Sequence, residues 1–144
     1  MDEKKMIGLV NTVGDAGGYQ LMEWFKLFPD DRERALREYI YLKVYLLRMA
    51  LHQTGTNLTD DEFNLFCAHT ADEYLASPGD YYGATPQGLL EALLAYQGQH
   101  YQDLIRIFAE RSGIASHSHA RQFVGELPDL FTTVLTRLRI ALKS

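Results

Sequence analysis

The segment from Asp30 to Gln53 restricts the fold more than any other part of the chain. At about 100° per residue on a helical wheel, its apolar side chains cover well over half of the circumference. The apolar arc consists of Leu36, Tyr39, Ile40, Leu42, Val44, Leu46, Leu47, Met49, Ala50 and Leu51. A helix that is apolar on so many sides must be surrounded by other elements. Asp30 with Glu33 matches a capping box, so we expect a helix over 30–53 at the centre of an all-α bundle.

Capping residues and periodicity predict the other helices. Thr59 with Glu62 forms a second capping box, and Thr85 before Pro86 offers an N-cap with proline at the first helical position. Gly113 is a plausible C-terminal cap, and apolar residues from Leu127 onward alternate steps of four and three, as in a buried helix seam. Besides 30–53, the expected helices span 19–28, 60–76, 86–111 and 116–124, with the seam running from 127 to 141.

A chain of 144 residues can bury a substantial core without metals or disulfides, and no linker or repeat divides it. Residues 1–18 are the least regular part, because glycines interrupt a short apolar run there. We therefore expect residues 1–144 to form a single helical domain of five to six helices, with 1–18 as an irregular N-terminal arm.

Charge and cysteine content exclude several classes of protein. The net charge of −5 disfavours generic binding to nucleic acid or to an anionic membrane. No segment reaches the roughly 18 apolar residues that a membrane span needs. The single cysteine, Cys67, excludes an intramolecular disulfide and fits a reducing compartment. These features predict a cytoplasmic protein that does not bind membranes.

The polar stripe of helix 30–53 is the best candidate for a ligand site. Glu38, Tyr41, Tyr45, Arg48 and His52 follow one another at steps of three and four residues, so they stack along one side of the helix. Two phenols, a guanidinium and an imidazole could bind an anion or an aromatic ligand in a groove. The alternative is a solvated helix face whose tyrosine rings lie on neighbouring helices.

Tyrosine content favours an interaction surface. Nine of the 144 residues are tyrosines, and tyrosine gives a large contact area at a small entropic cost. Tyr81 and Tyr82 lie on a glycine-flanked loop, and Lys43 lies within the apolar arc of helix 30–53, where it is either buried or at an interface. We therefore expect a non-enzymatic interaction module that binds another protein or, most simply, itself as a homodimer.

Arg111 and His117 bound the segment R-S-G-I-A-S-H. An arginine followed by a histidine at this distance resembles the active-site motif of HEPN-type ribonucleases, which are small all-α proteins. The resemblance covers seven residues, and Ser112 stands where that family usually has Asn, His or Asp. It implies that both side chains face RNA phosphate across a dimer interface, with histidine transferring protons and arginine stabilising negative charge.

Histidines raise the question of a metal site. His69 with Asp72 and Glu73, and His100 with Asp103, have helical spacings that place possible ligands on one face. Metal sites in carboxylate-bridged bundles draw Glu-x-x-His from two helices, and in this chain no histidine follows a glutamate by three residues. The sequence therefore predicts no metal and no cofactor.

Overall fold

The computed structural model describes residues 23, 25–53, 55, 59, 61–63, 65, 82–118 and 120–143. Every regular element in these ranges is a helix, which confirms the all-α class. The irregular arm expected over 1–18, Tyr81, Cys67 and most of the helix expected over 60–76 lie outside the described residues. The elements are η1 (Pro29–Asp31), α2 (Arg32–Gln53), α4 (Pro86–Tyr96), α5 (Tyr101–Arg111), η2 (Ile114–Ser116) and α6 (Ala120–Lys143).

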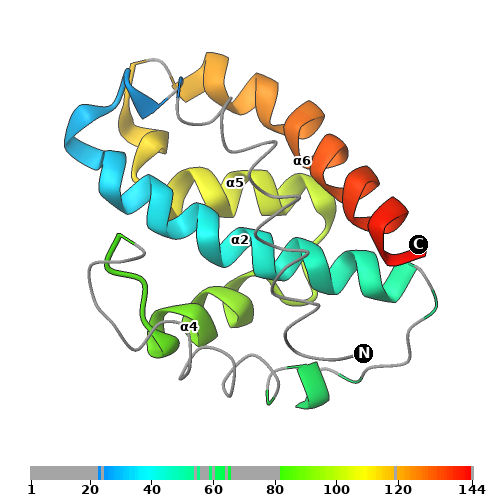
Figure 1. The fold of residues 1–144 in the computed structure, drawn as a ribbon. Coiled ribbons are helices and arrows are strands. Elements are labelled where there is room, and N and C mark those ends of the chain that lie inside the picture. Colours follow the sequence, from blue (N-terminus) through cyan, green and yellow to red (C-terminus); the bar gives the residue numbers. More distant parts are fainter. Residues whose placement is uncertain are drawn as a thin grey trace.

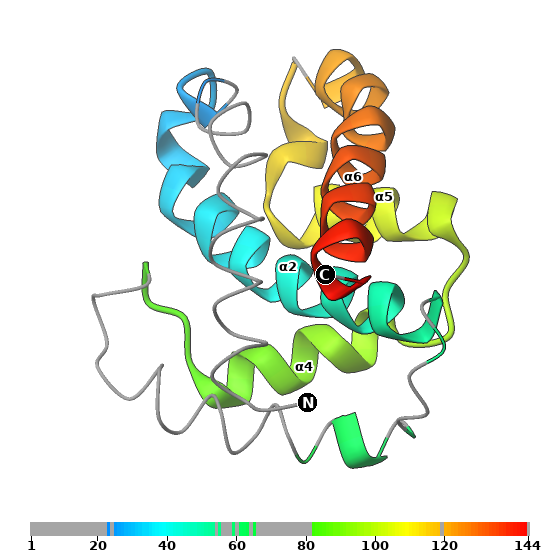
Figure 2. The same ribbon diagram turned by 45° about the vertical axis from the view of Figure 1, so that its right-hand side comes forward.

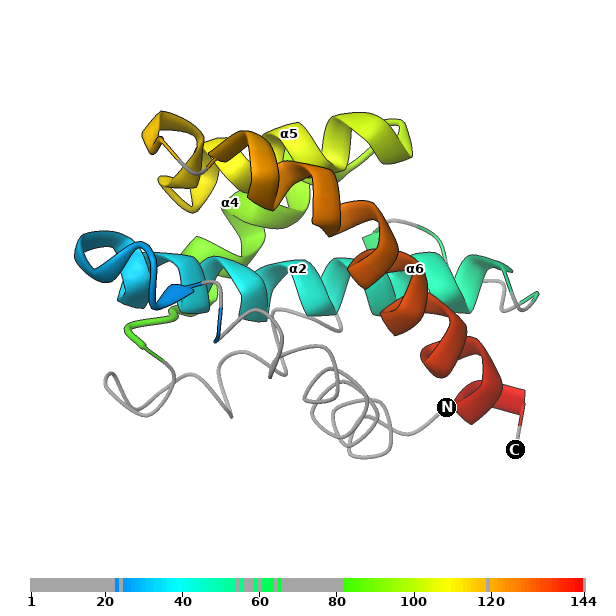
Figure 3. The same cartoon turned by 90° about the horizontal axis from the view of Figure 1, so that it is seen from above.

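Helix α2 packs against the three other long helices, α4, α5 and α6. In Figure 1 it runs between α4 below and α6 above, and Figure 2 shows the same order after a 45° turn. Seen from above in Figure 3, α6 crosses over α2 near the middle of α6. This arrangement follows from the apolar arc, since a helix with apolar side chains on several sides needs neighbours on several sides.

A cluster of phenylalanines joins α5 and α6 to the segment that precedes α2. The Phe123 ring of α6 lies 6.0 Å from Phe25, 5.9 Å from Phe28 and 6.5 Å from Phe108, between ring centroids. Phe108 also lies 5.9 Å from Phe131. All five side chains are at most 1 % exposed. Because a fully buried phenylalanine contributes roughly 1.5–3 kcal/mol, this cluster is a major source of stability.

Two of the predicted helix starts are confirmed. The Thr85 hydroxyl accepts a hydrogen bond from the Gly88 N–H at 3.0 Å, and Pro86 is the first residue of α4. The Thr59 hydroxyl accepts from the Glu62 N–H at 3.1 Å. In both places a threonine satisfies an N–H group that the first helical turn leaves without a backbone partner.

The start of α2 differs from the prediction. Asp30 lies inside the 3-10 turn η1, which has no side-chain cap, and α2 begins two residues later at Arg32. The carboxylate of the next residue, Asp31, contacts the His117 imidazole, with Oδ2 and Nε2 2.5 Å apart. Pro29 favours this tight turn, since its ring fixes φ near the helical value.

The prediction of one helix over 86–111 is wrong. Helix α4 ends at Tyr96 and α5 begins at Tyr101, with the break around Gly98. Gly98 has φ +74°, a left-handed conformation that ends a helix and that glycine adopts without steric cost. Gly113, with φ +84°, ends α5 in the same way, as the sequence predicted.

The prediction of a short helix over 116–124, separate from the seam, is also wrong. Helix α6 runs without interruption from Ala120 to Lys143 and contains Pro128. Proline removes one helical hydrogen bond, but Phe123, Leu127 and Phe131 are buried on both sides of it. Their packing holds the helix across the proline. Within the ranges that the structure describes, no helix is both long and apolar enough to cross a bilayer.

The N-terminus of α4 lies directly against α2. The Tyr41 hydroxyl accepts a hydrogen bond from the Thr85 N–H at 3.1 Å. A Cβ atom at Gly88 would overlap that hydroxyl and would lie 3.0 Å from Tyr41 Cζ. Glycine at this position therefore allows α4 to approach the Tyr41 ring, which is only 4 % exposed.

Replacing Gly88 and Gly125 separately by alanine tests this close approach. Gly88→Ala should lower the free energy of unfolding, because overpacking costs about 1–3 kcal/mol. Gly125 is also helical, but a Cβ there meets no atom within 4 Å. Gly125→Ala should therefore raise the stability by up to about 1 kcal/mol through helix propensity. Urea unfolding measures both effects, and equal stabilisation by the two substitutions would contradict the packing at Gly88.

Candidate functional site

Polar side chains of η1 and of the first three turns of α2 form a row that faces α4 and the end of α5. Asp31, Arg34, Glu38 and Tyr41 are spaced at three or four residues, so they share one side of the helix. Each contacts a different part of the facing backbone or side chains. This row continues the predicted stripe toward the N-terminus, and it holds the candidate site.

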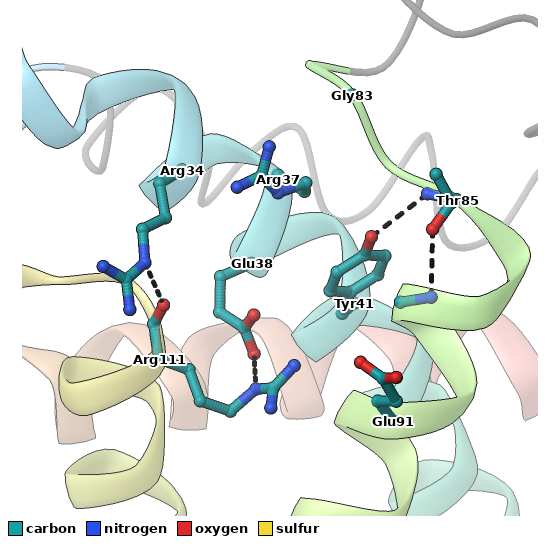
Figure 4. A pocket seen from close by; sticks show the side chains of 9 residues that line it. Arg34, Arg37, Glu38, Tyr41, Gly83, Thr85, Glu91 and Arg111 are labelled. Carbon is teal, nitrogen blue, oxygen red and sulfur yellow. Dashed lines mark hydrogen bonds and ion pairs between the residues drawn. The ribbon is translucent and has the colours of Figure 1, made fainter.

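Glu38 is a buried carboxylate at the middle of the row. It is 4 % exposed, and its Oε1 atom accepts hydrogen bonds from the Tyr96 hydroxyl at 2.6 Å and from Arg111 Nε at 2.7 Å. Figure 4 shows Arg111 reaching Glu38 from α5. A buried charge is costly unless it is paired and hydrogen-bonded. The two donors therefore tie α4 and α5 to the same atom of α2.

The environment of Glu38 shifts the pKa of both donors. Burial, with the charge and hydrogen bond of Glu38 added, raises the pKa of Tyr96 well above its ordinary value. For Arg111, burial lowers the pKa, but the hydrogen bond and charge of Glu38 outweigh this and raise it overall. The phenol therefore stays neutral, and the guanidinium stays charged, across the physiological range.

Arg34 holds the C-terminal end of α5. Its Nε donates to the Arg111 carbonyl at 2.8 Å, and its Nη2 to the Glu110 carbonyl at 3.4 Å. These carbonyls belong to the last helical turn, which lacks N–H partners of its own and carries a negative partial charge. Gly113 follows immediately, and a Cβ there would lie 2.8 Å from Asp31 Oδ1. The glycine thus allows α2 and η1 to lie close to this turn.

A cleft of about 340 Å³ opens beside Glu38, between α2, α4 and the end of α5. Figure 4 shows the side chains of Arg37, Tyr41, Glu91 and Arg111 around it. Three guanidinium groups and two carboxylates line this cleft. The lining residues are Arg34, Arg37, Glu38, Tyr41, Gly83, Thr85, Gly88, Glu91 and Arg111.

Arg37 joins the cleft to the turn before α4. Its Nη1 donates to the Tyr82 carbonyl at 3.3 Å. Tyr82 has φ +55°, an uncommon conformation for a residue with a side chain, and Gly83 follows with φ +80°. A strained residue of this kind persists only where its surroundings hold it in place, and such residues gather at functional sites.

The structure separates the predicted ligand residues. Tyr41 lines the cleft, whereas Tyr45, Arg48 and His52 do not. Tyr45 is 8 % exposed with its ring 5.5 Å from that of Tyr96, and burial raises its pKa. Arg48 lies 5.1 Å above the Phe63 ring, and His52 is exposed near the end of α2. The stripe is therefore mostly a packing surface, and only its N-terminal part reaches the cleft.

The predicted interface residues also lie apart. Lys43 is buried within the chain, at 8 % exposure, with its Nζ 5.1 Å from the centre of the Tyr39 ring. Tyr82 is 44 % exposed. Tyr81 lies outside the described residues.

Arg111 and His117 face different partners. Arg111 binds Glu38, whereas His117 contacts Asp31 and packs edge-on against Phe28, with ring centroids 4.8 Å apart. Seven residues of chain separate Glu38 from Asp31, or roughly 10 Å along a helix axis. In one copy of the chain the two side chains do not converge on one phosphate.

Sequence reasoning missed Arg34, Arg37 and Glu91 as site residues. Arg34 and Arg37 were detectable, because they stand three residues apart and continue the polar stripe beyond Glu38. The position of Glu91 opposite α2 depends on how α4 packs, which no local pattern specifies. No group of three or more His, Cys, Asp or Glu side chains in the described ranges is arranged to hold a metal ion.

Comparison with protein-family models, with curated proteins and with solved structures found no match. The chemistry of the site is therefore inferred from its own geometry.

Arg111→Met tests the buried ion pair. It leaves the Glu38 carboxylate buried without its cation, which should cost up to about 3 kcal/mol of unfolding free energy. Arg106→Met is the matched control, because Arg106 pairs with Glu110 in solvent, where an ion pair is worth less than about 1 kcal/mol. Chemical denaturation measures the difference. Equal losses in the two variants would show that the Glu38 pair is not buried as described.

Alkaline unfolding tests the environment of Tyr96. Because its folded-state pKa is raised above the ordinary value of 10.0, the stability it contributes is complete below pH 10 and is lost as the pH rises toward the folded-state pKa. Tyr96→Phe should lower stability at neutral pH by about 1 kcal/mol and should reduce the further loss above pH 10. Tyr82→Phe, at a tyrosine that is 44 % exposed, is the matched control. A Tyr96→Phe slope equal to that of the parent protein would refute this assignment.

Proposed function

We propose that the protein binds a small anionic molecule in the cleft between α2, α4 and the end of α5. One observation carries this proposal: among the described residues, Arg34 and Arg37 line the cleft without an ion pair to any carboxylate. In the part of the chain that the structure describes, both guanidinium groups bond only to backbone carbonyls. Guanidinium groups with donors to spare are the preferred partners of carboxylate and phosphate oxygens.

The position of α4 supports the same conclusion. Its N-terminal turn, with Thr85 and Gly88, forms one wall of the cleft. The helix dipole places partial positive charge at this end, which adds to the charge of the arginines. The volume of about 340 Å³ lies at the small end of the range for ligand pockets. This favours a compact metabolite over a nucleotide or a peptide.

We further propose that residues 1–144 form one domain of five or six helices, built around the apolar helix 30–53. The proposal also takes the reducing cytoplasm as the protein's compartment, in keeping with the single Cys67. In this arrangement, the polar row on α2 contacts the ligand, and the apolar arc of the same helix packs in the hydrophobic core.

Self-association is a second proposal, and the exposure of Tyr82 favours it. Tyr82 is one of five large hydrophobic side chains that are exposed in the described part of the chain, with Leu27, Leu65, Leu94 and Ile140. The other candidate residues are buried within one copy of the chain, namely Tyr41, Tyr45 and Lys43. In this second proposal the homodimer contact therefore includes the exposed Tyr82.

Arg37→Gln tests the anion site. Inorganic phosphate and propionate serve as probes, and two-dimensional ¹H–¹⁵N NMR follows the amide signals of Gly83, Thr85 and Gly88. We expect saturating shifts at these amides with dissociation constants of roughly 0.1–10 mM, and at least a fivefold weakening in Arg37→Gln. The substitution removes the positive charge and keeps a polar side chain, and the half-buried Arg37 lies outside the hydrophobic core.

Arg137→Gln is the matched control, because Arg137 is an exposed arginine of α6 that does not line the cleft. It should bind both probes as the parent protein does. If neither probe shifts these amides, or if both variants lose binding equally, the cleft is not an anion site.

A further inference from the structure

The carboxylates of the cleft indicate the class of its ligand. Glu38 is 4 % exposed, yet only its Oε1 atom accepts hydrogen bonds from the residues that the structure describes. Buried carboxylate oxygens are nearly always hydrogen-bonded, so Oε2 requires a donor. Because Glu38 lines the cleft, that donor can come from whatever occupies the cleft.

Glu91 provides a second acceptor on the opposite wall. It projects from α4 toward Tyr41 and Arg111 in Figure 4. The hydrogen bond and charge of Glu38 are the main causes that raise the pKa of Arg111, and the charge of Glu91 adds a smaller contribution. The hydrogen bond it accepts, from Gln87 Nε2 at 3.2 Å, engages only Oε1. Its other oxygen can accept from a ligand.

The charged side chains of the cleft fall into two groups. Arg34 and Arg37 on α2 carry two positive charges, whereas Glu38, Arg111 and Glu91 together carry a net charge of −1, because Arg111 is paired with Glu38. A ligand with two negative charges would bring one of them against a carboxylate, and like charges at short range are repelled. A ligand with one negative and one positive charge would complement both groups.

We propose that the cleft binds a small zwitterion, a molecule with a carboxylate or phosphate on the Arg34 and Arg37 side and an ammonium group on the Glu91 side. This rests on the proposed anion site and specifies its ligand class. The ammonium donates to Glu91 and to Glu38 Oε2, and so satisfies the acceptor that the fold leaves open. An amino acid and an amino-phosphate share this chemistry.

Three compounds that share a –CH2CH2COO− unit or its methyl-terminated form test the proposal. Propionate carries a carboxylate alone, β-alanine adds an ammonium at the far carbon, and succinate adds a second carboxylate there. Titration calorimetry or NMR on the whole chain should show β-alanine binding about five- to tenfold tighter than propionate, and succinate no tighter than propionate. Phosphoethanolamine distinguishes the two anion types: tighter binding than β-alanine assigns phosphate, and weaker binding assigns carboxylate.

Glu91→Gln should reduce the preference for β-alanine over propionate nearly to unity, because the amide keeps the shape but loses the charge. Glu126→Gln is the matched control, since Glu126 is an exposed residue of α6 outside the cleft, and it should keep the full preference. Thermal unfolding should show both variants folded, because Glu91 is exposed as well.

The outcomes separate the two proposals. If propionate and β-alanine bind equally in the parent protein, or if Glu91→Gln keeps the full preference, the zwitterion inference is wrong while the anion site stands. If none of the compounds binds at the cleft, the anion site itself is wrong.

Discussion

The buried carboxylate of Glu38 is the interaction on which the rest of the structure depends. Its Oε1 atom accepts from Tyr96 of α4 and from Arg111 of α5, so a single atom of α2 fixes two other helices. Removing such a charge from water costs free energy, and its two hydrogen-bond donors must stay in place to offset that desolvation cost. Apolar packing can tolerate small slips between helices, whereas this pair of bonds cannot. The carboxylate thus specifies how α4 and α5 meet α2, and the cleft lies at that meeting point.

Glycines make the close approaches around this carboxylate possible. A Cβ atom at Gly88 would meet Tyr41, one at Gly83 would lie 3.2 Å from Arg37 Nη1, and one at Gly113 would meet Asp31. In each case a polar side chain of η1 or α2 reaches the backbone of another segment where that backbone has no side chain. Gly83 and Gly113 also have positive φ, so these two positions favour glycine for a second reason. The polar row and the facing glycines therefore form one complementary surface.

Local signals in the sequence predicted the class of fold and several helix starts, because they depend on neighbouring residues. The apolar arc of 30–53 and the N-cap at Thr85 are of this kind. The break at Gly98 was missed because a glycine that interrupts a helix and one that a helix tolerates have the same local pattern. The continuity of α6 through Pro128 was missed because tertiary packing outweighs the loss of one hydrogen bond.

The site was harder to predict than the fold for a related reason. Tyr41 and Tyr45 were placed on a ligand-binding stripe from residue type, yet both are buried against α4, which a helical wheel cannot show. Arg111 was singled out for its distance from His117, whereas its partner in the structure is Glu38, 73 residues away in sequence. Long-range pairing of this kind depends on how the helices pack, and no single segment encodes it.

Support of the fold and the proposed ligand contacts fall on partly different residues of the cleft, and Glu38 takes part in both. Glu38 and Arg111 belong to the support, because their removal leaves a buried charge or a buried acceptor without a partner. Arg37 and Glu91 lie nearer the solvent and hold no helix pair together by an ion pair among the described residues. Since a bound ligand stabilises only the folded state, it adds to the support without replacing it. Substitutions at the outer residues can therefore change affinity separately from stability, whereas those at Glu38 must change both.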